Sequence, residues 1–262
     1  MTVLTKKRSR RNEISMLKDY VVIDLEMTGL NAKTDKILEV AAVRVRDGKE
    51  TEVFSAVTNP QITLSEKITE LTGITQKDAD EGLPLDDTVQ KFLEFLGDDI
   101  LVGQNVIFDF SFLKQWAVNH KLVLEKQAVD TLKLARLFLP AEQKKDLESL
   151  CAYFEIPRVN AHRALDDARE TAQIFEKMKV IYGAEHAEAF LPKPLLYKAK
   201  KQSPATERQK EYLRRFAKYH GIALEEFSPM MTKSEASRLT DRLIATYGKM
   251  EKEKETEENA IS

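Results

Sequence analysis

The chain has 262 residues, of which 42% are hydrophobic and 32% are charged, a composition typical of globular rather than disordered proteins. No apolar run approaches the roughly 20 residues of a membrane span, and the first residues lack the apolar segment of a secretory signal, so we expect no membrane partner. The one cysteine, Cys151, excludes an internal disulfide framework and a cysteine-rich zinc site, and it favours a reducing, cytoplasmic location.

Charge is distributed unevenly along the chain, although the net charge is only −2. Residues 1–20 carry a net charge of +4, residues 21–195 carry −9 and residues 196–248 carry +5. An acidic body between two basic segments indicates that the body holds cations, that the flanks bind a polyanion, or that these surfaces are only solvated. Charge alone leaves these alternatives open.

The body begins with strand signals and continues with helical ones. Strands are expected over residues 20–26, 37–46 and 51–57, with Asp47 and Gly48 forming a turn between the second and the third. Helical patterns follow over residues 64–71, 85–95, 110–118, 147–154 and 164–181, and a short buried strand is expected over residues 99–104. This order predicts an α/β fold with a mixed sheet flanked by helices.

The remaining segments divide the chain into five parts. We expect a basic N-terminal arm over residues 1–17, the main domain over 18–190, a proline-containing linker over 191–203, a small basic helical module over 204–248 and a charged, disordered tail over 249–262. In the module, Thr206 is placed to cap a helix and Gly221 to end it.

The first helix of the module combines positive and aromatic side chains. Its members are Lys210, Tyr212, Arg214, Arg215, Lys218 and Tyr219. Such a helix is suited to a polyanion, whose phosphates would be neutralised by the cations. The alternative is a solvated face whose aromatic residues form a small core. We expect nucleic-acid binding, as a hypothesis.

Asp24 and Glu26 lie two residues apart in the first strand, so their side chains point to the same face while Val21, Ile23 and Leu25 are buried on the other. Two neighbouring carboxylates repel each other unless a positive group lies between them. Taken alone, the pair also fits a solvent-facing strand edge.

Two further segments place acids near expected helix starts. Asp109 follows an apolar strand and a turn, and by itself it fits an N-cap. His162 precedes the longest helical pattern, and Asp166 and Asp167 fit first-turn acids favoured by the helix dipole.

Together these segments suggest a metal-dependent hydrolase. Four carboxylates, those of Asp24, Glu26, Asp109 and Asp167, balance the charge of two divalent cations, and oxygen ligands select Mg²⁺ or Mn²⁺. Two such ions form the clamp used for displacement at phosphorus. A histidine such as His162 titrates near neutrality and is suited to deprotonate the attacking water.

At these residues the sequence resembles the DEDDh subgroup of the DEDD exonucleases, the superfamily of the proofreading epsilon subunit of bacterial DNA polymerase III. The similar segments are DLEMTG at Asp24–Gly29, GQNVIFDFSFL at Gly103–Leu113 and the pattern His-x-Ala-x-x-Asp at His162, Ala164 and Asp167. Residues 71–84 and 130–136 are also similar, and the resemblance covers residues 18–182.

The resemblance implies a ribonuclease H-like fold and a two-metal 3′–5′ exonuclease that releases nucleoside 5′-monophosphates. By position, Asp24, Glu26, Asp109 and Asp167 would hold the metals and His162 would be the general base. The residues expected beside the 3′-terminal nucleotide are Met27, Thr28, Gly29, Leu30, Asn105 and Phe108. Phe108 either stacks on a base or belongs to the core, and Asp130 is expected to be structural rather than a ligand.

The substrate and the partners stay open at this level. The first motif is close to that of oligoribonucleases, whereas the second is closer to the epsilon type. Single-stranded 3′ ends of DNA are the favoured substrate, with a DNA polymerase or repair complex as an expected partner. The alternatives are an RNA-trimming exonuclease and a non-catalytic nucleic-acid-binding adaptor that retains the fold. The presence of all four acids and of His162 argues against the adaptor.

Overall fold

The computed structural model of the chain describes residues 16–158, 162–222 and 231–250. Most of the expected basic arm and of the charged tail, residues 1–15 and 251–262, therefore lie outside the described residues. The chain divides into two compact units, residues 1–199 and 200–262, and each is described by itself. Within the described ranges, no helix is both long enough and apolar enough to cross a lipid bilayer.

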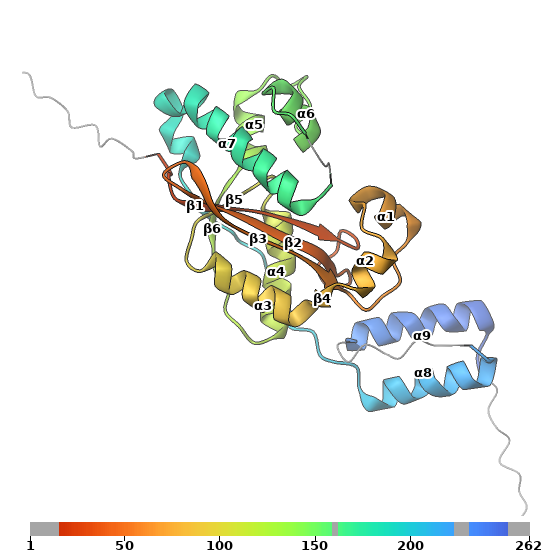
Figure 1. The fold of residues 1–262 in the computed structure, drawn as a ribbon. Helices are drawn as coiled ribbons and strands as arrows, with labels where there is room; N and C mark the ends of the chain where they lie inside the picture. Colours follow the sequence, from red (N-terminus) through yellow and green to blue (C-terminus); the bar gives the residue numbers. More distant parts are fainter. Residues whose placement is uncertain (1–15, 159–161, 223–230, 251–262) are drawn as a thin grey trace, which may run out of the picture. The chain divides into compact units, whose positions relative to one another are not determined.

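The first unit is built on a seven-stranded mixed sheet with the order β4-β3-β2-β1-β5-β6-β7 (Figure 1). The strands are β1 (Tyr20–Met27), β2 (Ile37–Arg46), β3 (Lys49–Asn59), β4 (Leu83–Pro84), β5 (Leu101–Gly103), β6 (Gln127–Asp130) and β7 (Lys193–Pro194). β1, β2 and β3 are antiparallel, whereas β5 runs parallel to β1 and β6 runs parallel to β5. Asp47 and Gly48 both have positive φ between β2 and β3, which confirms the expected turn.

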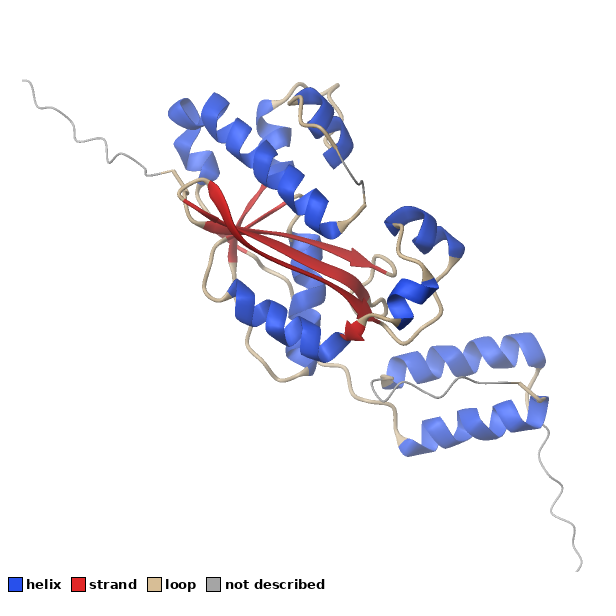
Figure 2. Ribbon diagram, in the orientation of Figure 1, coloured by secondary structure: helices blue, strands red, loops and turns tan. Residues whose placement is uncertain are grey.

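Helices cover both faces of this sheet (Figure 2). They are α1 (Glu66–Thr72), α2 (Gln76–Asp80), α3 (Leu85–Leu96), α4 (Ile107–Asn119), α5 (Thr131–Phe138), α6 (Leu147–Tyr153), α7 (Ala164–His186) and the 3₁₀ helix η1 (Ala187–Phe190). α3 and α4 contribute to the core on one face, and α5, α6 and α7 contribute to the core on the other. The expected α/β class with a mixed sheet is confirmed.

The alternation of β1 decides which core each of its side chains enters. Residues of the core with α3 and α4 are Val21, Ile23, Leu25 and Met27, and those of the core with α7 are Tyr20 and Val22. Asp24 and Glu26 continue the second series, because side chains two apart share a face. Asp24 and Glu26 therefore replace the apolar residues that would extend this core toward the start of α7.

The expected linker over residues 191–203 begins later in the structure. Lys193–Pro194 forms β7, which pairs antiparallel with β6, and the N–H of Leu195 donates to the Lys126 carbonyl at 2.9 Å. Leu195 and Tyr197 also pack against the core. Proline is compatible with an edge strand because its missing N–H faces no neighbour. The prolines therefore mark the sheet edge rather than a break.

The described residues of the second unit form two helices, α8 (Glu207–His220) and α9 (Lys233–Tyr247). Thr206 and Gln209 form a capping box at the start of α8, and Gly221 ends it with φ of 63°, as predicted. The N–H of Ala205 donates to the Met231 carbonyl at 2.7 Å, which joins the two helix starts. The helices share a small core made of Ala205, Leu213, Phe216, Ala236 and Leu243.

Gly103 ends β5 where the chain turns toward α4, and its backbone packs closely against Val106 and Ile23. A Cβ there would lie 2.9 Å from the Val106 Cβ and 3.3 Å from the Ile23 carbonyl oxygen. Because neither atom moves without its backbone, we expect Gly103→Ala to lower the free energy of unfolding by about 1–3 kcal/mol in urea titrations.

The matched control is Gly183→Ala in α7. Its added Cβ would meet only the end of the flexible Met16 side chain, with Cε at 2.5 Å and Sδ at 3.3 Å. Removing a glycine from a helix interior should leave stability unchanged or raise it by up to about 1 kcal/mol. Equal stability of Gly103→Ala and the unchanged chain would contradict the packing argument.

Candidate active site

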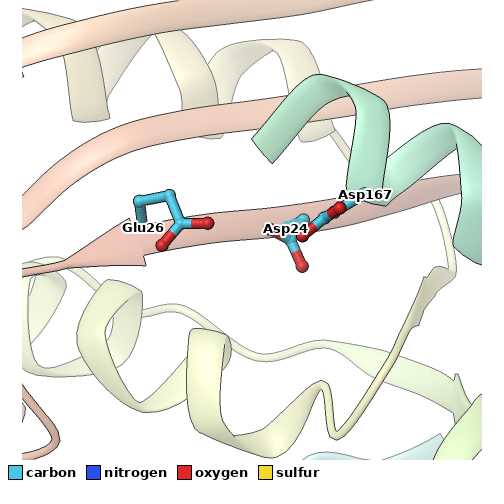
Figure 3. A group of neighbouring side chains, drawn as sticks. All are labelled: Asp24, Glu26 and Asp167. Carbon is cyan, nitrogen blue, oxygen red and sulfur yellow. The ribbon is translucent and has the colours of Figure 1, made fainter. Parts of the chain in front are cut away.

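Three carboxylates from two elements converge on one point of the sheet. Asp24 and Glu26 come from β1 and Asp167 from α7, and their ligand oxygens all lie within 4.8 Å of one another. Figure 3 shows the Asp167 side chain directed from its helix toward Asp24. The structure thus brings together three of the four acids expected to hold metal, although Asp167 follows Glu26 by 141 positions in the sequence.

Asp109 lies beside this group on α4 and is only 5% exposed. β5 pairs with β1 only at Val21 and Val22. Further along β1, the Leu25 N–H donates to Asp109 Oδ1 at 3.0 Å. The N-cap interpretation is wrong, because α4 begins at Ile107. Asp109 instead ties the first turn of α4 to the backbone of β1.

An open cavity of about 350 Å³ lies over these acids. Its lining includes Asp24, Glu26, Phe108, Asp109, His162 and Asp167. His162 is exposed and adopts φ of 64°, the left-handed region that non-glycine residues rarely occupy. The four expected metal ligands and the expected base therefore share one cavity.

The pKa values of the acids reflect this crowding. Burial first, and then the charges of Asp167 and Glu39, raise the pKa of Glu26 from 4.5 to about 8. The pKa of Asp109 is raised to about 7, mainly by burial. The pKa of Asp24 lies well above its ordinary range because of burial and the charge of Asp109. The cluster therefore favours either protons or bound cations.

A buried ion pair holds the start of α7 against β2. Glu39 is 1% exposed and accepts from Arg163 Nη2 at 2.9 Å and from the Ala164 N–H at 3.1 Å. In the sheet register Glu39 stands opposite Glu26. Arg163 and Ala164 directly follow His162 and open the helical turn that carries Asp167. By binding them, Glu39 positions His162 and Asp167.

A second pair holds Asp167 from the other side. Arg158 Nη2 donates to Asp167 Oδ1 at 2.7 Å, and Arg158 Nε lies 2.8 Å from Glu170 Oε2. Burial raises the pKa of Asp167, whereas the charge of Arg158 lowers it. Arg158 thus supplies positive charge at the cavity wall, which keeps the Asp167 carboxylate in place.

The six residues expected beside a nucleotide do not form one surface. Phe108 lines the cavity and is also half-buried against the core, and its stacking on a base stays a prediction. The Met27 side chain is 8% exposed within the core, and its expected position beside the nucleotide stays a prediction. Thr28 Oγ1 accepts from the Lys36 N–H at 2.9 Å, and Leu30 is 84% exposed beyond the end of β1.

Two nearby positions have local structural roles. The Asn105 N–H donates to Asp130 Oδ1 at 3.1 Å, and Asp130 also caps α5, which agrees with the structural role expected for it. Gly29 leaves no room for a side chain, since a Cβ would meet the Asp35 carboxylate at 2.5 Å. Contacts of Thr28, Gly29, Leu30 and Asn105 with a nucleotide stay predictions.

Sequence reasoning did not single out Glu39, Arg158 and Glu170 at this site. Glu39 carried a signal, because it is the one acid inside the apolar run ILEVAAV of β2. Burying such a charge requires a partner. Arg158 and Glu170 carried none, since charged residues at such positions are usually solvated.

The raised pKa of Glu26 predicts that the metal-free protein becomes less stable as pH rises. The unfolded chain releases this proton near pH 4.5, whereas the folded chain retains it to about pH 8. Between these values the folded state binds more protons, so the free energy of unfolding falls with pH. In EDTA at pH 8, Glu26→Gln should raise Tm by roughly 5 °C.

Thermal scans between pH 5 and pH 8.5 test this expectation. Added Mg²⁺ or Mn²⁺ should restore the Tm of the unchanged chain at pH 8, because bound cations stabilise the ionised acids. Glu70→Gln on the exposed face of α1 is the control and should leave the pH dependence intact. A metal-free Tm that stays level or rises over this range would contradict the prediction.

Removing Arg163 should leave the buried Glu39 charge without its partner. We expect Arg163→Ala to lower the free energy of unfolding by about 2 kcal/mol, below the range for fully buried pairs because Arg163 is half exposed. The double variant Glu39→Gln/Arg163→Ala should recover part of this loss. Arg169→Ala breaks the exposed pair with Glu50 and should lose less than about 1 kcal/mol. Equal losses of stability for Arg163→Ala and Arg169→Ala would contradict the role of the Glu39–Arg163 pair.

Comparison with known proteins agrees with this site. Residues 21–175 match the sequence profile of the family described as Exonuclease. The DNA polymerase III PolC-type of Clostridium perfringens is 39% identical over 172 residues, which is 64% of this chain and 12% of that protein. The corresponding protein of Bacillus subtilis is 41% identical over 164 residues, 61% of this chain and 11% of that protein. The chain thus spans about an eighth of the length of these relatives.

Solved structures share the fold of the first unit. Exonuclease X in complex with 5′ overhanging duplex DNA has a TM-score of 0.52 and 24% identity, covering 66% of this chain and 99% of that one. The nuclease domain of 3′hExo, a DEDDh family member bound to rAMP, has a TM-score of 0.53 and 22% identity, covering 62% and 91%. The expected ribonuclease H-like fold is confirmed. Since the matched segment spans more than half of the sequence and contains all four acids and His162, the chain belongs to the exonuclease family.

Proposed function

We propose that the chain is a metal-dependent 3′–5′ exonuclease that hydrolyses the terminal phosphodiester bond of DNA and releases nucleoside 5′-monophosphates. The observation that carries this proposal is the meeting of the Asp24, Glu26 and Asp167 oxygens within 4.8 Å, beneath an open cavity. Membership of the exonuclease family supports the reaction class.

The acids fit a pair of divalent ions. The donor set consists of carboxylate oxygens, which suit Mg²⁺ or Mn²⁺. Burial raises the pKa values of Glu26 and Asp109, so their ionised forms need a positive partner. Asp24, Glu26, Asp109 and Asp167 would hold two such ions, whose charge of +4 balances theirs. When bound, the ions stabilise charge on the attacking and leaving oxygens of the phosphate.

His162 is the proposed general base. It lies at the cavity in an exposed position, and the Glu39–Arg163 pair holds the residues that follow it. Its imidazole would accept a proton from water as the water oxygen bonds to phosphorus. The bond between phosphorus and the 3′ oxygen of the preceding nucleotide then breaks, and that oxygen gains a proton. Phe108 at the cavity would stack on the terminal base.

DNA is the proposed substrate because the relatives that match the chain are named as DNA polymerases. Single-stranded 3′ ends are the proposed form, with Thr28, Gly29, Leu30 and Asn105 near the last nucleotide. The same relatives support a polymerase or repair complex as partner. The single cysteine, Cys151, is buried and unpaired, which supports a reducing, cytoplasmic compartment. RNA trimming is the second candidate, supported by the similarity of DLEMTGL to oligoribonucleases.

The experiment uses DNA and RNA of one sequence, labelled at the 5′ end, with Mg²⁺ or Mn²⁺. We expect a ladder that shortens from the 3′ end and disappears in EDTA. Asp167→Asn should reduce the rate at least 100-fold, and His162→Ala should reduce it by about 10²–10⁴. Asp166→Asn is the matched control and should retain most activity, because Asp166 is outside the acid cluster.

Each outcome assigns the function. Faster shortening of the labelled DNA supports the deoxyribonuclease proposal, and faster shortening of the labelled RNA supports the second candidate. Binding of both polymers without shortening would replace the enzyme by an adaptor. Equal effects of Asp166→Asn and Asp167→Asn would show that the acid cluster is not the active site.

A further inference from the structure

A stripe of alternating positive and aromatic side chains runs along α8. Its members are Arg208, Tyr212, Arg215 and Tyr219, and we call them the α8 stripe. Their spacing of four, three and four residues places them on one face of a helix, over a length of about 16 Å. Three of the four are exposed, and Tyr219 is 53% exposed. Only Tyr212 packs partly against the small core of this unit.

The cations of the stripe are not used by the fold. In the described part of the first unit, Arg44, Arg46, Arg158, Arg163 and Arg169 all form ion pairs. Within the described part of the second unit, by contrast, no carboxylate lies within ion-pair distance of Arg208 or Arg215. Lys210 was expected to act together with Arg215, but it forms an ion pair with Glu207 at 3.1 Å.

The surrounding charge strengthens this surface. Residues 200–222 and 231–250 contain 11 lysines and arginines but four acids. An excess of this size on a unit of two helices creates a field that attracts polyanions. Folding does not require the excess, because the small core and the two capping boxes hold the helices together.

The aromatic side chains of the α8 stripe favour single-stranded nucleic acid over other polyanions. His220 lies with its ring centroid 4.8 Å from Tyr219 and 6.0 Å from Tyr247, so that the stripe ends in a group of rings. Tyr247 is 49% exposed. Unpaired bases stack on exposed aromatic rings, whereas the bases of a duplex are already stacked on each other. A single strand uses both the cations and the rings.

We propose that the α8 stripe is a second nucleic-acid site that binds single-stranded DNA or RNA, with phosphates on Arg208 and Arg215 and a base on Tyr219. This inference deepens the proposed function, on whose substrate class it rests. The stripe holds the strand without sequence preference, since every base has a face that stacks. The stripe belongs to the second unit, whereas the acid cluster belongs to the first.

The test measures binding by the full chain in EDTA, where no cleavage takes place. Fluorescence anisotropy is followed with a labelled 20-nucleotide DNA, with RNA of the same sequence and with the matching DNA duplex, over a range of salt. We expect the single strands to bind more tightly than the duplex at equal salt. Tyr219→Ala should weaken single-strand binding about tenfold, and Tyr219→Phe should restore it, because phenylalanine retains the ring.

The arginines are tested against a matched pair. Arg208→Ala/Arg215→Ala should weaken binding and reduce the slope of log K against log salt by about 1.4, at about 0.7 for each lost phosphate contact with a single strand. Arg238→Ala/Arg242→Ala removes the same charge from α9 and should have a smaller effect. All of these positions are exposed, so unchanged thermal unfolding is expected and serves as a check on folding.

The outcomes separate this inference from the proposed function. Equal losses in the α8 and α9 pairs would overturn the stripe in favour of general charge attraction. Preference for the duplex, or no effect of Tyr219→Ala, would overturn the stacking role. In the cleavage assay with Mg²⁺, the stripe variants should raise KM and leave kcat unchanged. If Asp167→Asn loses cleavage and keeps binding, the proposed function is supported. If the stripe variants lose binding and keep kcat, the α8 stripe is supported.

Discussion

The repulsion among buried carboxylates is the constraint around which the first unit is arranged. Asp24 and Glu26 interrupt the apolar series on one face of β1, and Asp167 approaches them from α7. Such an arrangement opposes folding, because burial and like charges both disfavour the ionised acids. The raised pKa values of Glu26 and Asp109 are the result. Sites of this kind store destabilisation where function requires charge, and the rest of the structure offsets it.

The neighbouring elements stabilise that arrangement by fixing backbone and charge together. Glu39 is itself buried and negative, yet it clamps Arg163 and the first N–H of α7, and Arg158 holds Asp167 from the opposite side. Asp109 bonds to the backbone of β1 instead of capping its own helix. Asp109 and Asp167 are thus each held by a contact outside the cluster, and these contacts fix the two acids beside Asp24 and Glu26 despite the repulsion.

The two units use positive charge in different ways. In the described part of the first, five arginines form ion pairs that join strands and helices, and Arg44 and Arg46 both reach Asp99. In the second, hydrophobic contacts and helix caps hold two helices, and the arginines of the α8 stripe remain available. A positive surface that the fold does not consume is free for a polyanion, and an acidic centre that repels itself is suited to cations. The two units thus have complementary electrostatic characters.

The sequence by itself determined the elements whose signals are local. Alternation in β1, the Asp47–Gly48 turn, the Thr206 cap and the Gly221 end all follow from neighbouring residues, and the motifs identified the four acids and His162. Short elements such as α2, α5 and β6 escaped, because a few residues carry too weak a period. Only the tertiary structure placed Met27 in the core, Pro194 in an edge strand, and Glu39 and Arg158 at the site. These assignments depend on contacts between residues far apart in the chain, and no local pattern records which partner a buried charge will meet.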